Sequence, residues 1–258
     1  MPQSRWSAVL EWPQATFLGA RGDRWRGLLS GMAGASAVFL GVFDRAASPP
    51  APREPLAASR VAGFETNHGE AEAAVRFLSR ADGFSLGLAT AEARLRPACP
   101  ANRCPVIRLR FVGTEAASRL VPEDPLPGAA YAAVLYDGLY PGIGIRFVGY
   151  GGDLSYTFLV DRGASPQSVV LELDGVDHIE SGADGGFLAT GAGARLALPA
   201  PAARQYVGRE RVVVEARYVV RGRRVSLDVG AYDIRCPLEI SGGRAKLTDP
   251  HAVEARSP

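Results

Sequence analysis

Apolar residues recur at every second position along most of the chain, and this period limits the possible folds more than any other feature of the sequence. Ile107, Leu109 and Phe111, for example, alternate with two arginines. Successive side chains of a β-strand point to opposite faces, so this pattern predicts strands with one face in a core and the other in water. No long helix is required after residue 75, and the sequence therefore predicts an all-β fold.

Two segments have the pattern of β-hairpins. The first spans residues 143–160 around a glycine-rich turn at 149–153, and the second spans residues 214–229 around a turn at 221–224. Shorter apolar runs lie between them and are separated by glycine turns. Many short strands with glycine turns are typical of an antiparallel β-sandwich, formed here by one unit or by two packed sub-sandwiches.

The first 45 residues have the layout of an export signal. Arginines at 21, 24 and 26 precede the apolar run Leu28–Phe43, and small residues follow it. The run is short for a bilayer span, which needs about 20 apolar residues, so we expect a cleaved signal or an uncleaved N-terminal anchor helix. A translation start at Met32 would remove part of this signal. The interpretation places the rest of the chain in the periplasm, at the cell surface or in the medium, with membrane contact only through this segment.

The remainder is expected to divide into three parts. Residues 46–60 are rich in proline and predict an extended linker. Residues 61–240 carry the alternating pattern and predict the β-sandwich module. Residues 241–258 are expected to form a polar C-terminal tail.

The cysteines fit an oxidising compartment. Cys99 and Cys104 enclose a short loop, for which we expect a disulfide outside the cytoplasm, and Cys236 remains as a thiol. A zinc site needs about four ligands, and neither a second cysteine pair nor a closely spaced histidine pair supplies them. We therefore expect no metal site and no cofactor.

The 29 basic and 27 acidic residues give a formal charge of +2, so no global field favours nucleic acid as a partner. Local binding candidates are Tyr150 in a loop and Tyr206, Arg209 and Arg217 in the most basic region. Arginine and tyrosine together suit contact with a surface protein or a glycan through hydrogen bonds and stacking. Interspersed acidic residues make a solvated sheet face the simpler interpretation of this region.

Three motifs suggest catalysis or metal binding, but each has a simpler explanation. Ser85 stands in a Gly-x-Ser-x-Gly pattern, yet the alternation around it is that of a plain strand rather than a nucleophile elbow. Asn67 and Gly69, in the Asn67–Glu70 segment, suit a turn that needs a positive φ or an Asx bond, with His68 in water. The acidic cluster from Asp174 to Asp184 lacks the spacing of a calcium loop and is expected to flank strands.

Several segments resemble one family in the same order along the chain. They are Phe64–Glu70 with Val75–Arg80, Leu139–Ile143 with Tyr156–Val160 and Gly163–Pro166, and Val229–Asp233 with Pro237–Ile240. The family is the N-terminal β module, a domain of unknown function, of bacterial SBBP-repeat (β-propeller-repeat) surface proteins. The resemblance implies export, a β-sandwich-like fold and a place at the cell surface, and it brings no catalytic residues. No propeller repeats follow Ile240 in this chain.

These observations favour an exported, non-enzymatic structural or recognition module. The alternative is an extracellular hydrolase with a carboxylate or serine site, and a cleft with a hydrogen-bonded acid pair, or a serine near His68 or His178, would support it.

Overall fold

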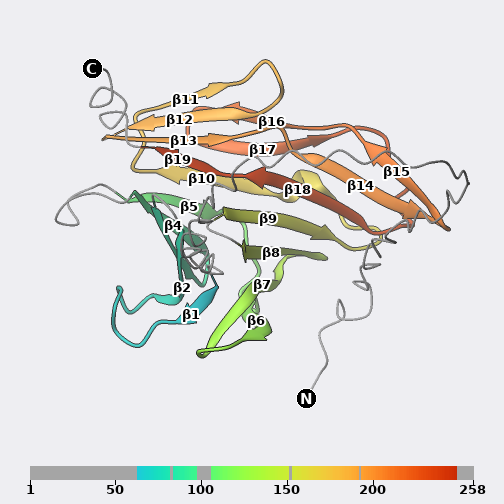
Figure 1. The fold of residues 1–258 in the computed structure, drawn as a ribbon. Helices are drawn as coiled ribbons and strands as arrows, with labels where there is room; N and C mark the ends of the chain where they lie inside the picture. Colours follow the sequence, from blue (N-terminus) through green and yellow to red (C-terminus); the bar gives the residue numbers. More distant parts are fainter. Residues whose placement is uncertain (1–62, 82–83, 98–105, 151–152, 192, 249–258) are drawn as a thin grey trace, which may run out of the picture. The chain divides into compact units, whose positions relative to one another are not determined.

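The computed structural model describes residues 63–81, 84–97, 106–150, 153–191 and 193–248. The expected N-terminal signal or anchor helix, the proline-rich linker at 46–60 and the Cys99–Cys104 pair lie outside these residues. Within them the chain is all-β, as predicted, and the helical structure is one 3-10 turn at Pro166–Ser168 (Figure 1).

The strands are short and follow one another closely along the chain. They are β1 (Phe64–Thr66), β2 (Val75–Ala81), β3 (Phe84–Ala89), β4 (Glu92–Pro97), β5 (Ile107–Phe111), β6 (Arg119–Leu126), β7 (Ala130–Tyr140), β8 (Ile143–Tyr150), β9 (Asp153–Val160), β10 (Val170–Asp174), β11 (His178–Ser181), β12 (Phe187–Gly191), β13 (Ala194–Leu198), β14 (Ala202–Val207), β15 (Glu210–Val214), β16 (Ala216–Arg221), β17 (Arg224–Val229), β18 (Leu238–Arg244) and β19 (Lys246–Thr248). Both predicted hairpins are confirmed, as β8–β9 and β16–β17.

Fifteen of these strands form one antiparallel sheet, and its order explains how two layers arise from a single sheet. The order is β15-β14-β18-β9-β8-β7-β1-β2-β3-β4-β5-β10-β17-β16, with β6 paired to β7. The three-residue strand β1 joins two halves of this sheet, β15 to β7 on one side and β2 to β16 on the other. Phe64 of β1 lies opposite both Ser79 of β2 and Tyr131 of β7. The end strands β15 and β16 follow each other in the chain with only Glu215 between them, so the sheet is nearly closed.

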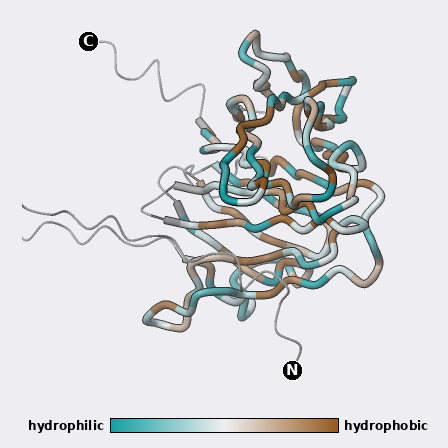
Figure 2. The backbone as a smooth tube through the Cα atoms, turned by 90° about the vertical axis from the view of Figure 1, so that its right-hand side faces the viewer, coloured by the Kyte–Doolittle hydropathy of each residue, from teal (hydrophilic) through white to brown (hydrophobic). Residues whose placement is uncertain are grey.

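Aromatic side chains fill the space between the two halves. Phe111 of β5 meets Tyr136 of β7 with ring centroids 5.2 Å apart, and the series continues through Phe147 and Tyr156 to Phe158. These rings belong to one core cluster that includes residues of both sheets. Hydrophobic and hydrophilic residues alternate along the strands, as Figure 2 shows. The inward position of alternate side chains in β5, Ile107, Leu109 and Phe111, confirms the predicted period of two.

A separate four-stranded sheet, β11-β12-β13-β19, packs against this core. Phe187 of β12 meets Tyr218 of β16 edge-to-face at 5.2 Å. The two sheets are also joined by a backbone hydrogen bond of 2.9 Å from Tyr218 N to Gly185 O, in the β11–β12 turn. Burying such large apolar side chains stabilises the fold by about 1.5–3 kcal/mol each, which favours one shared core over two independent units.

The C-terminal boundary differs from the expected one. Strand β18 runs on to Arg244, and β19 pairs with β13, so the segment predicted as a polar tail from residue 241 contributes to both sheets. Gly242 permits this course, because a Cβ at that position would lie 2.1 Å from the ring of Tyr156. The Tyr156 hydroxyl lies 2.6 Å from the Tyr218 hydroxyl and links the two halves of the large sheet inside the core. The sequence Gly242–Gly243 suggests the end of a strand, but in the structure β18 continues through it and passes over the buried Tyr156.

Candidate functional sites

The predicted binding residues are distributed over three places. Tyr206 in β14 and Arg209 in the following turn belong to one hairpin, which we call the terminal hairpin and define as β14, Gly208–Arg209 and β15. Arg217 lies on β16, the strand at the other end of the sheet order, and its Nε donates to Asp228 over 2.8 Å. Tyr150 is the last residue of β8, and its side chain is outside the described part of the structure.

The terminal hairpin has a buried inner face and an exposed outer face. Its turn begins with Gly208 at φ +64°, a conformation that a type II′ turn requires at its first central position. Ala203, Gln205 and Val214 are buried, whereas Tyr206 and Val213 point to the opposite face. The alternation of the two strands therefore places an aromatic and an aliphatic side chain in water.

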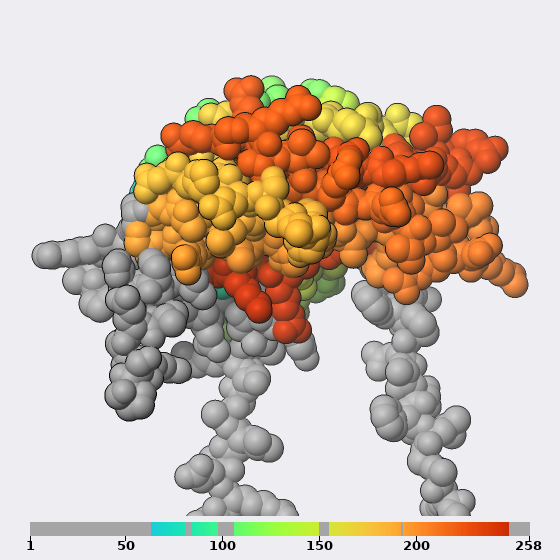
Figure 3. All heavy atoms as spheres, turned by 90° about the horizontal axis from the view of Figure 1, so that it is seen from above, coloured from blue at the N-terminus to red at the C-terminus, as the bar shows by residue number. Residues whose placement is uncertain are grey.

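Exposed large hydrophobic side chains are concentrated on this hairpin. Four are exposed in the described part of the chain: Tyr206 (54%), Val207 (41%), Val213 (75%) and Ile234 (59%). The first three belong to the terminal hairpin, which forms one end of the described part in Figure 3. Scattered single apolar residues on a surface need no explanation, but Tyr206 and Val213 share the outer face of one hairpin and indicate a contact surface there, while Val207 lies at the hairpin end on the side of Gln205.

The outer edge of β15 is open as well. Among the described strands, β15 pairs only with β14. In an antiparallel ladder, hydrogen-bonded pairs alternate with non-hydrogen-bonded pairs, and the pair Val207–Glu210 that closes the two-residue turn is hydrogen-bonded. The backbone N–H and C=O groups of Arg211 and Val213 therefore point away from β14. Unpaired edge groups of this kind are where a partner strand can add to a sheet.

The inner face of the terminal hairpin has a structural role. The Gln205 side chain donates to the Asp233 carbonyl over 3.0 Å and accepts from the Asp233 N–H over 2.8 Å. Hydrogen bonds from the Arg235 side chain lower the pKa of Asp233 to about 2. The buried Gln205 amide thus bonds to both backbone groups of Asp233, whose carbonyl also accepts the Cys236 N–H over 3.0 Å, and these bonds hold the loop before β18 against β14.

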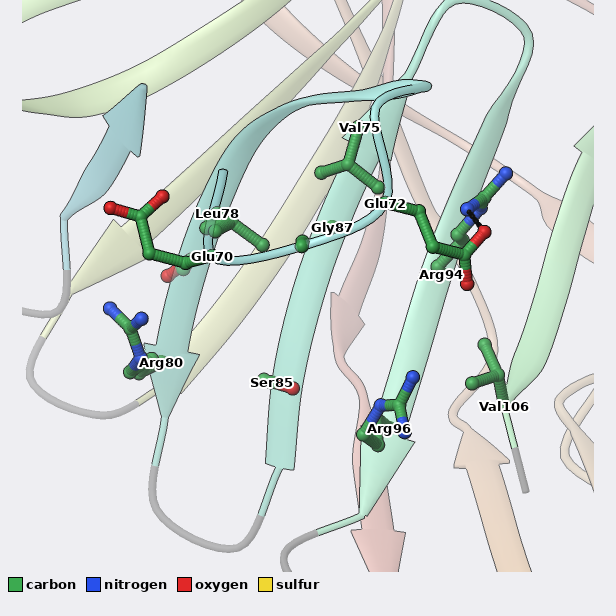
Figure 4. Close-up of a pocket in the computed structure, with 12 residues that line it drawn as sticks. Glu70, Glu72, Val75, Leu78, Arg80, Ser85, Gly87, Arg94, Arg96 and Val106 are labelled. Carbon is green, nitrogen blue, oxygen red and sulfur yellow. Dashed lines mark hydrogen bonds and ion pairs between the residues drawn. The ribbon is translucent and has the colours of Figure 1, made fainter. Parts of the chain in front are cut away.

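A second candidate site lies on the outer face of β2, β3 and β4, and we call it the roofed pocket. It is a hollow of about 280 Å³ lined by Glu70, Ala71, Glu72, Val75, Leu78, Ser79, Arg80, Ser85, Gly87, Arg94, Arg96 and Val106. The segment between β1 and β2 covers one end of it, and the three strands form its floor (Figure 4).

Asn67 organises the roof of this pocket. Its Oδ1 accepts from the N–H groups of Gly69 and Ala71, each over 3.1 Å, which confirms the predicted Asx turn. Its Nδ2 donates to the Val75 carbonyl over 2.9 Å and also contacts the carbonyls of Ala71 and Glu72. Gly69 has φ +116°, as the turn requires. One side chain thus holds the whole roof segment in place.

Gly87 makes room under the roof. A Cβ at Gly87 would lie 3.1 Å and 3.2 Å from the two γ-carbons of Val75. Val75 is buried and packs directly over this glycine, while the half-buried Leu78 lies beside it on the neighbouring strand. The absence of a side chain at residue 87 therefore lets Val75 pack closely against β3, beside the hollow.

The charged residues around the pocket form a fixed arrangement. The Arg94 side chain is only 15% exposed and forms ion pairs with Glu72 of the roof and with Glu92. Burial alone would lower the pKa of Arg94, but hydrogen bonds and the charges of these two glutamates raise it overall. Hydrogen bonds from its own backbone N–H and from the His68 N–H, the latter over 2.7 Å, lower the pKa of the Glu70 carboxyl. Arg80 pairs with Glu65 over 2.9 Å in water.

The motifs considered for catalysis have structural positions. Ser85 lies within β3, as the plain-strand interpretation predicted, and the register places it directly opposite Arg80 and Arg96. No histidine is among the described residues that line the pocket. His178 lies in the other sheet, 3.3 Å from Glu180, with both side chains exposed.

The acidic cluster and the remaining cysteine likewise have no metal-site geometry. Asp174 accepts from Arg223 over 3.0 Å, and the Asp184 carboxylate accepts the Gly186 N–H over 2.9 Å within the β11–β12 turn. Cys236 is a free, half-buried thiol. Within the described ranges, no three His, Cys, Asp or Glu residues gather closely enough to hold a metal ion.

Comparison with known families and proteins adds one finding. A domain of unknown function, DUF7948, is found at residues 128–241. No curated protein and no solved structure matches the chain. The matched range begins just before β7 and ends within β18, so it contains the terminal hairpin, whereas the strands of the roofed pocket precede it.

In the part of the chain that the structure describes, no helix has the length and apolar character needed to cross a membrane. The expected signal or anchor segment is outside that part.

No single segment of the sequence indicates the roofed pocket. The Asn67 turn and the strand position of Ser85 are each predicted from local residues alone. Arg80, Ser85 and Arg96 come together only through the registers of β2, β3 and β4. The local signal for Arg96 is the alternation of Arg94 and Arg96 with the buried residues Ala93 and Leu95. This pattern indicates that both arginines lie on the outer face of a strand, but not which residues lie beside them.

Proposed function

We propose that the protein is an exported, non-enzymatic recognition module that binds another surface protein through the terminal hairpin. The observation that carries this proposal is the concentration of exposed Tyr206, Val207 and Val213 on the element that ends the large sheet. A pair of β-strands with an open edge suits the addition of a partner strand, in which backbone hydrogen bonds supply affinity and side chains supply specificity.

The charge of the hairpin favours a partner with acidic side chains. Arg209 and Arg211 are exposed beside Tyr206, and neither forms an ion pair with a residue that the structure describes. An arginine that has no carboxylate partner among the described residues is suited to a bidentate contact with a carboxylate of another chain. An extended, acidic segment of a surface protein therefore fits both the backbone edge and the side chains.

Export and a place at the cell surface rest on the sequence. The basic and apolar layout of the first 45 residues and the resemblance to the N-terminal module of SBBP-repeat surface proteins support them. Fractionation of producing bacterial cells, followed by mass determination with and without reductant, tests export, signal cleavage and the Cys99–Cys104 bond together. A full-length product in the cytoplasm with three free thiols contradicts this part.

The binding experiment uses the full chain against an array of immobilised bacterial envelope proteins and a parallel array of glycans. We expect binding to envelope proteins that Val213→Asp and Tyr206→Ser abolish, because both changes alter the outer face alone. Ile234→Ser is the matched control, since it removes an exposed apolar side chain outside the hairpin. Binding only to glycans, or binding to proteins that survives both hairpin changes, contradicts the proposal.

The alternative is an extracellular hydrolase. Its one favourable observation is that Ser85, Glu70 and Glu72 line the same pocket. An ester or glycoside hydrolysis by the full chain that Ser85→Ala abolishes, with unchanged thermal unfolding, would replace the non-enzymatic proposal.

A further inference from the structure

On the outer floor of the roofed pocket, a serine lies between two arginines. Ser85 of β3 lies directly opposite Arg80 of β2 on one side and Arg96 of β4 on the other. Side chains directly opposite each other in antiparallel strands share a face, with Cβ atoms about 4.5–5.5 Å apart. Figure 4 shows Arg80 and Arg96 on either side of Ser85.

The next row of the same face is more apolar. Leu78, Gly87 and Arg94 lie opposite one another there, and Val75 packs over Gly87, where there is no side chain. Val75 closes the upper end of the pocket. The pocket thus combines an apolar wall with a polar row.

The roof is built before any ligand arrives. Asn67 fixes its backbone, and the ion pair between Glu72 and the mostly buried Arg94 ties it to β4. A site whose groups are already held in position loses less entropy on binding than one that must be ordered.

The negative charges near the pocket are already engaged. Glu72 is paired with Arg94, and the Glu70 carboxylate accepts a backbone N–H of its own turn. Glu65 pairs with Arg80, but both side chains are more than half exposed, and a pair in that environment contributes little and is readily replaced. An incoming anion can therefore take the place of Glu65 on Arg80.

We propose that the roofed pocket binds a small organic anion, with its carboxylate, sulfate or phosphate group held by Arg80, Ser85 and Arg96 and its remaining atoms against Leu78 and Val75. The guanidinium groups donate charge-assisted hydrogen bonds to the anion, and the Ser85 hydroxyl donates a third. The volume of about 280 Å³ is below the roughly 300–1,000 Å³ typical of pockets for drug-sized ligands, so the ligand is the size of one sugar acid or amino acid.

This site is independent of the proposed function, because it lies on other strands and outside residues 128–241. The variants that test it leave the terminal hairpin unchanged, and Val213→Asp leaves the pocket unchanged. Failure of either proposal is therefore distinguishable from failure of the other.

The test is an NMR and calorimetric titration of the full chain with glucuronate, glucose 6-phosphate, glucose and inorganic sulfate. We expect binding of the anionic sugars and no binding of glucose at the same concentration. Preference for glucuronate over glucose 6-phosphate identifies a carboxylate as the natural group, and the reverse identifies a phosphate. Binding of sulfate alone shows a nonspecific anion site and overturns the part of the proposal that concerns an organic ligand.

Substitutions of the two arginines test whether the ligand binds in the roofed pocket. Arg80→Gln and Arg96→Gln should each weaken binding about tenfold or more, since each removes hydrogen bonds from a charged donor. Arg110→Gln is the matched control, because it removes an exposed arginine on the neighbouring strand that does not line the pocket, and it should change binding less than about twofold.

A smaller substitution tests the same site in case the arginine variants do not fold. Ser85→Ala removes one half-buried oxygen and is expected to fold, with binding weakened severalfold. Equal binding of glucose, absence of any anion binding up to about 10 mM, or unchanged affinity in both arginine variants overturns the proposal.

Discussion

The roofed pocket and the terminal hairpin are both on outer faces of the same sheet, yet their exposed surfaces are held in opposite ways. In the pocket, polar side chains make many contacts within the chain: Asn67 alone bonds to four residues of the roof and its end. On the outer face of the hairpin, Tyr206 and Val213 are exposed, and β15 has no described partner strand on the side away from β14. A surface whose polar groups are already bonded within the chain suits a small ligand. A surface with exposed apolar side chains and an unpaired strand edge suits a second protein.

The contrast predicts that stability depends on the pocket region and hardly on the outer face of the hairpin. We expect the largest effect from Asn67→Ala, which should lower the free energy of unfolding by about 2–3 kcal/mol, because it leaves backbone groups of the roof without partners. Denaturant unfolding of the full chain measures it. His68→Ala, at the neighbouring exposed position, is the control. Equal effects of the two substitutions on the free energy of unfolding would contradict the claim that Asn67 holds the roof.

Gln205→Leu tests whether the terminal hairpin is structural on its inner face only. The change removes both bonds to the backbone of Asp233 and should lower stability by about 1–3 kcal/mol. The adjacent outward residue provides the comparison, because Tyr206→Ser should shift the unfolding midpoint far less. A reversed order would mean that the outer face is packed against something within the chain.

A methyl group at Gly87 tests how closely the roof fits its floor. Gly87→Ala should cost about 1 kcal/mol relative to Gly230→Ala, as expected for overpacking. At Gly230 the nearest atom to an added Cβ is 3.4 Å away, against 3.1 Å at Gly87. Thermal unfolding of both variants checks this difference, and equal melting temperatures would indicate that Val75 moves aside freely.

The smallest effect is expected on the outer face of the hairpin. Val213→Asp should change the free energy of unfolding by no more than about 0.5 kcal/mol, because the side chain is mostly in water and an exposed substitution of this kind removes few contacts. A loss of 2 kcal/mol or more, measured by denaturant unfolding, would show that Val213 is covered and would remove it from the proposed contact surface.

The sequence predicted the local structure well because alternation and turn chemistry are local properties. The all-β fold, the two hairpins and the Asx turn at Asn67 follow from residues close together in the chain. Arrangements that depend on distant pairing could not be predicted in the same way. Neither the joining of two halves by β1 nor the meeting of Arg80, Ser85 and Arg96 has a signal within any single segment.

The C-terminal strands show the same limit. Lys246–Thr248 contains a single apolar residue, Leu247, so its sequence resembles a polar tail, but that residue is buried when β19 pairs with β13. Likewise, Tyr206 and Arg209 were recognisable as binding candidates, whereas their place at the end of the large sheet depends on the order of strands from all parts of the chain.

Residue-resolved amide hydrogen exchange on the full chain tests the open edge of β15 most directly. The account predicts alternation along this strand: slow exchange for the amides of Val212 and Val214, which face β14, and fast exchange for those of Arg211 and Val213. The amides of Gly69 and Ala71, bonded to Asn67, should exchange slowly in the same experiment. Equal protection of all four amides from Arg211 to Val214 would show that the edge is already covered and would contradict the account.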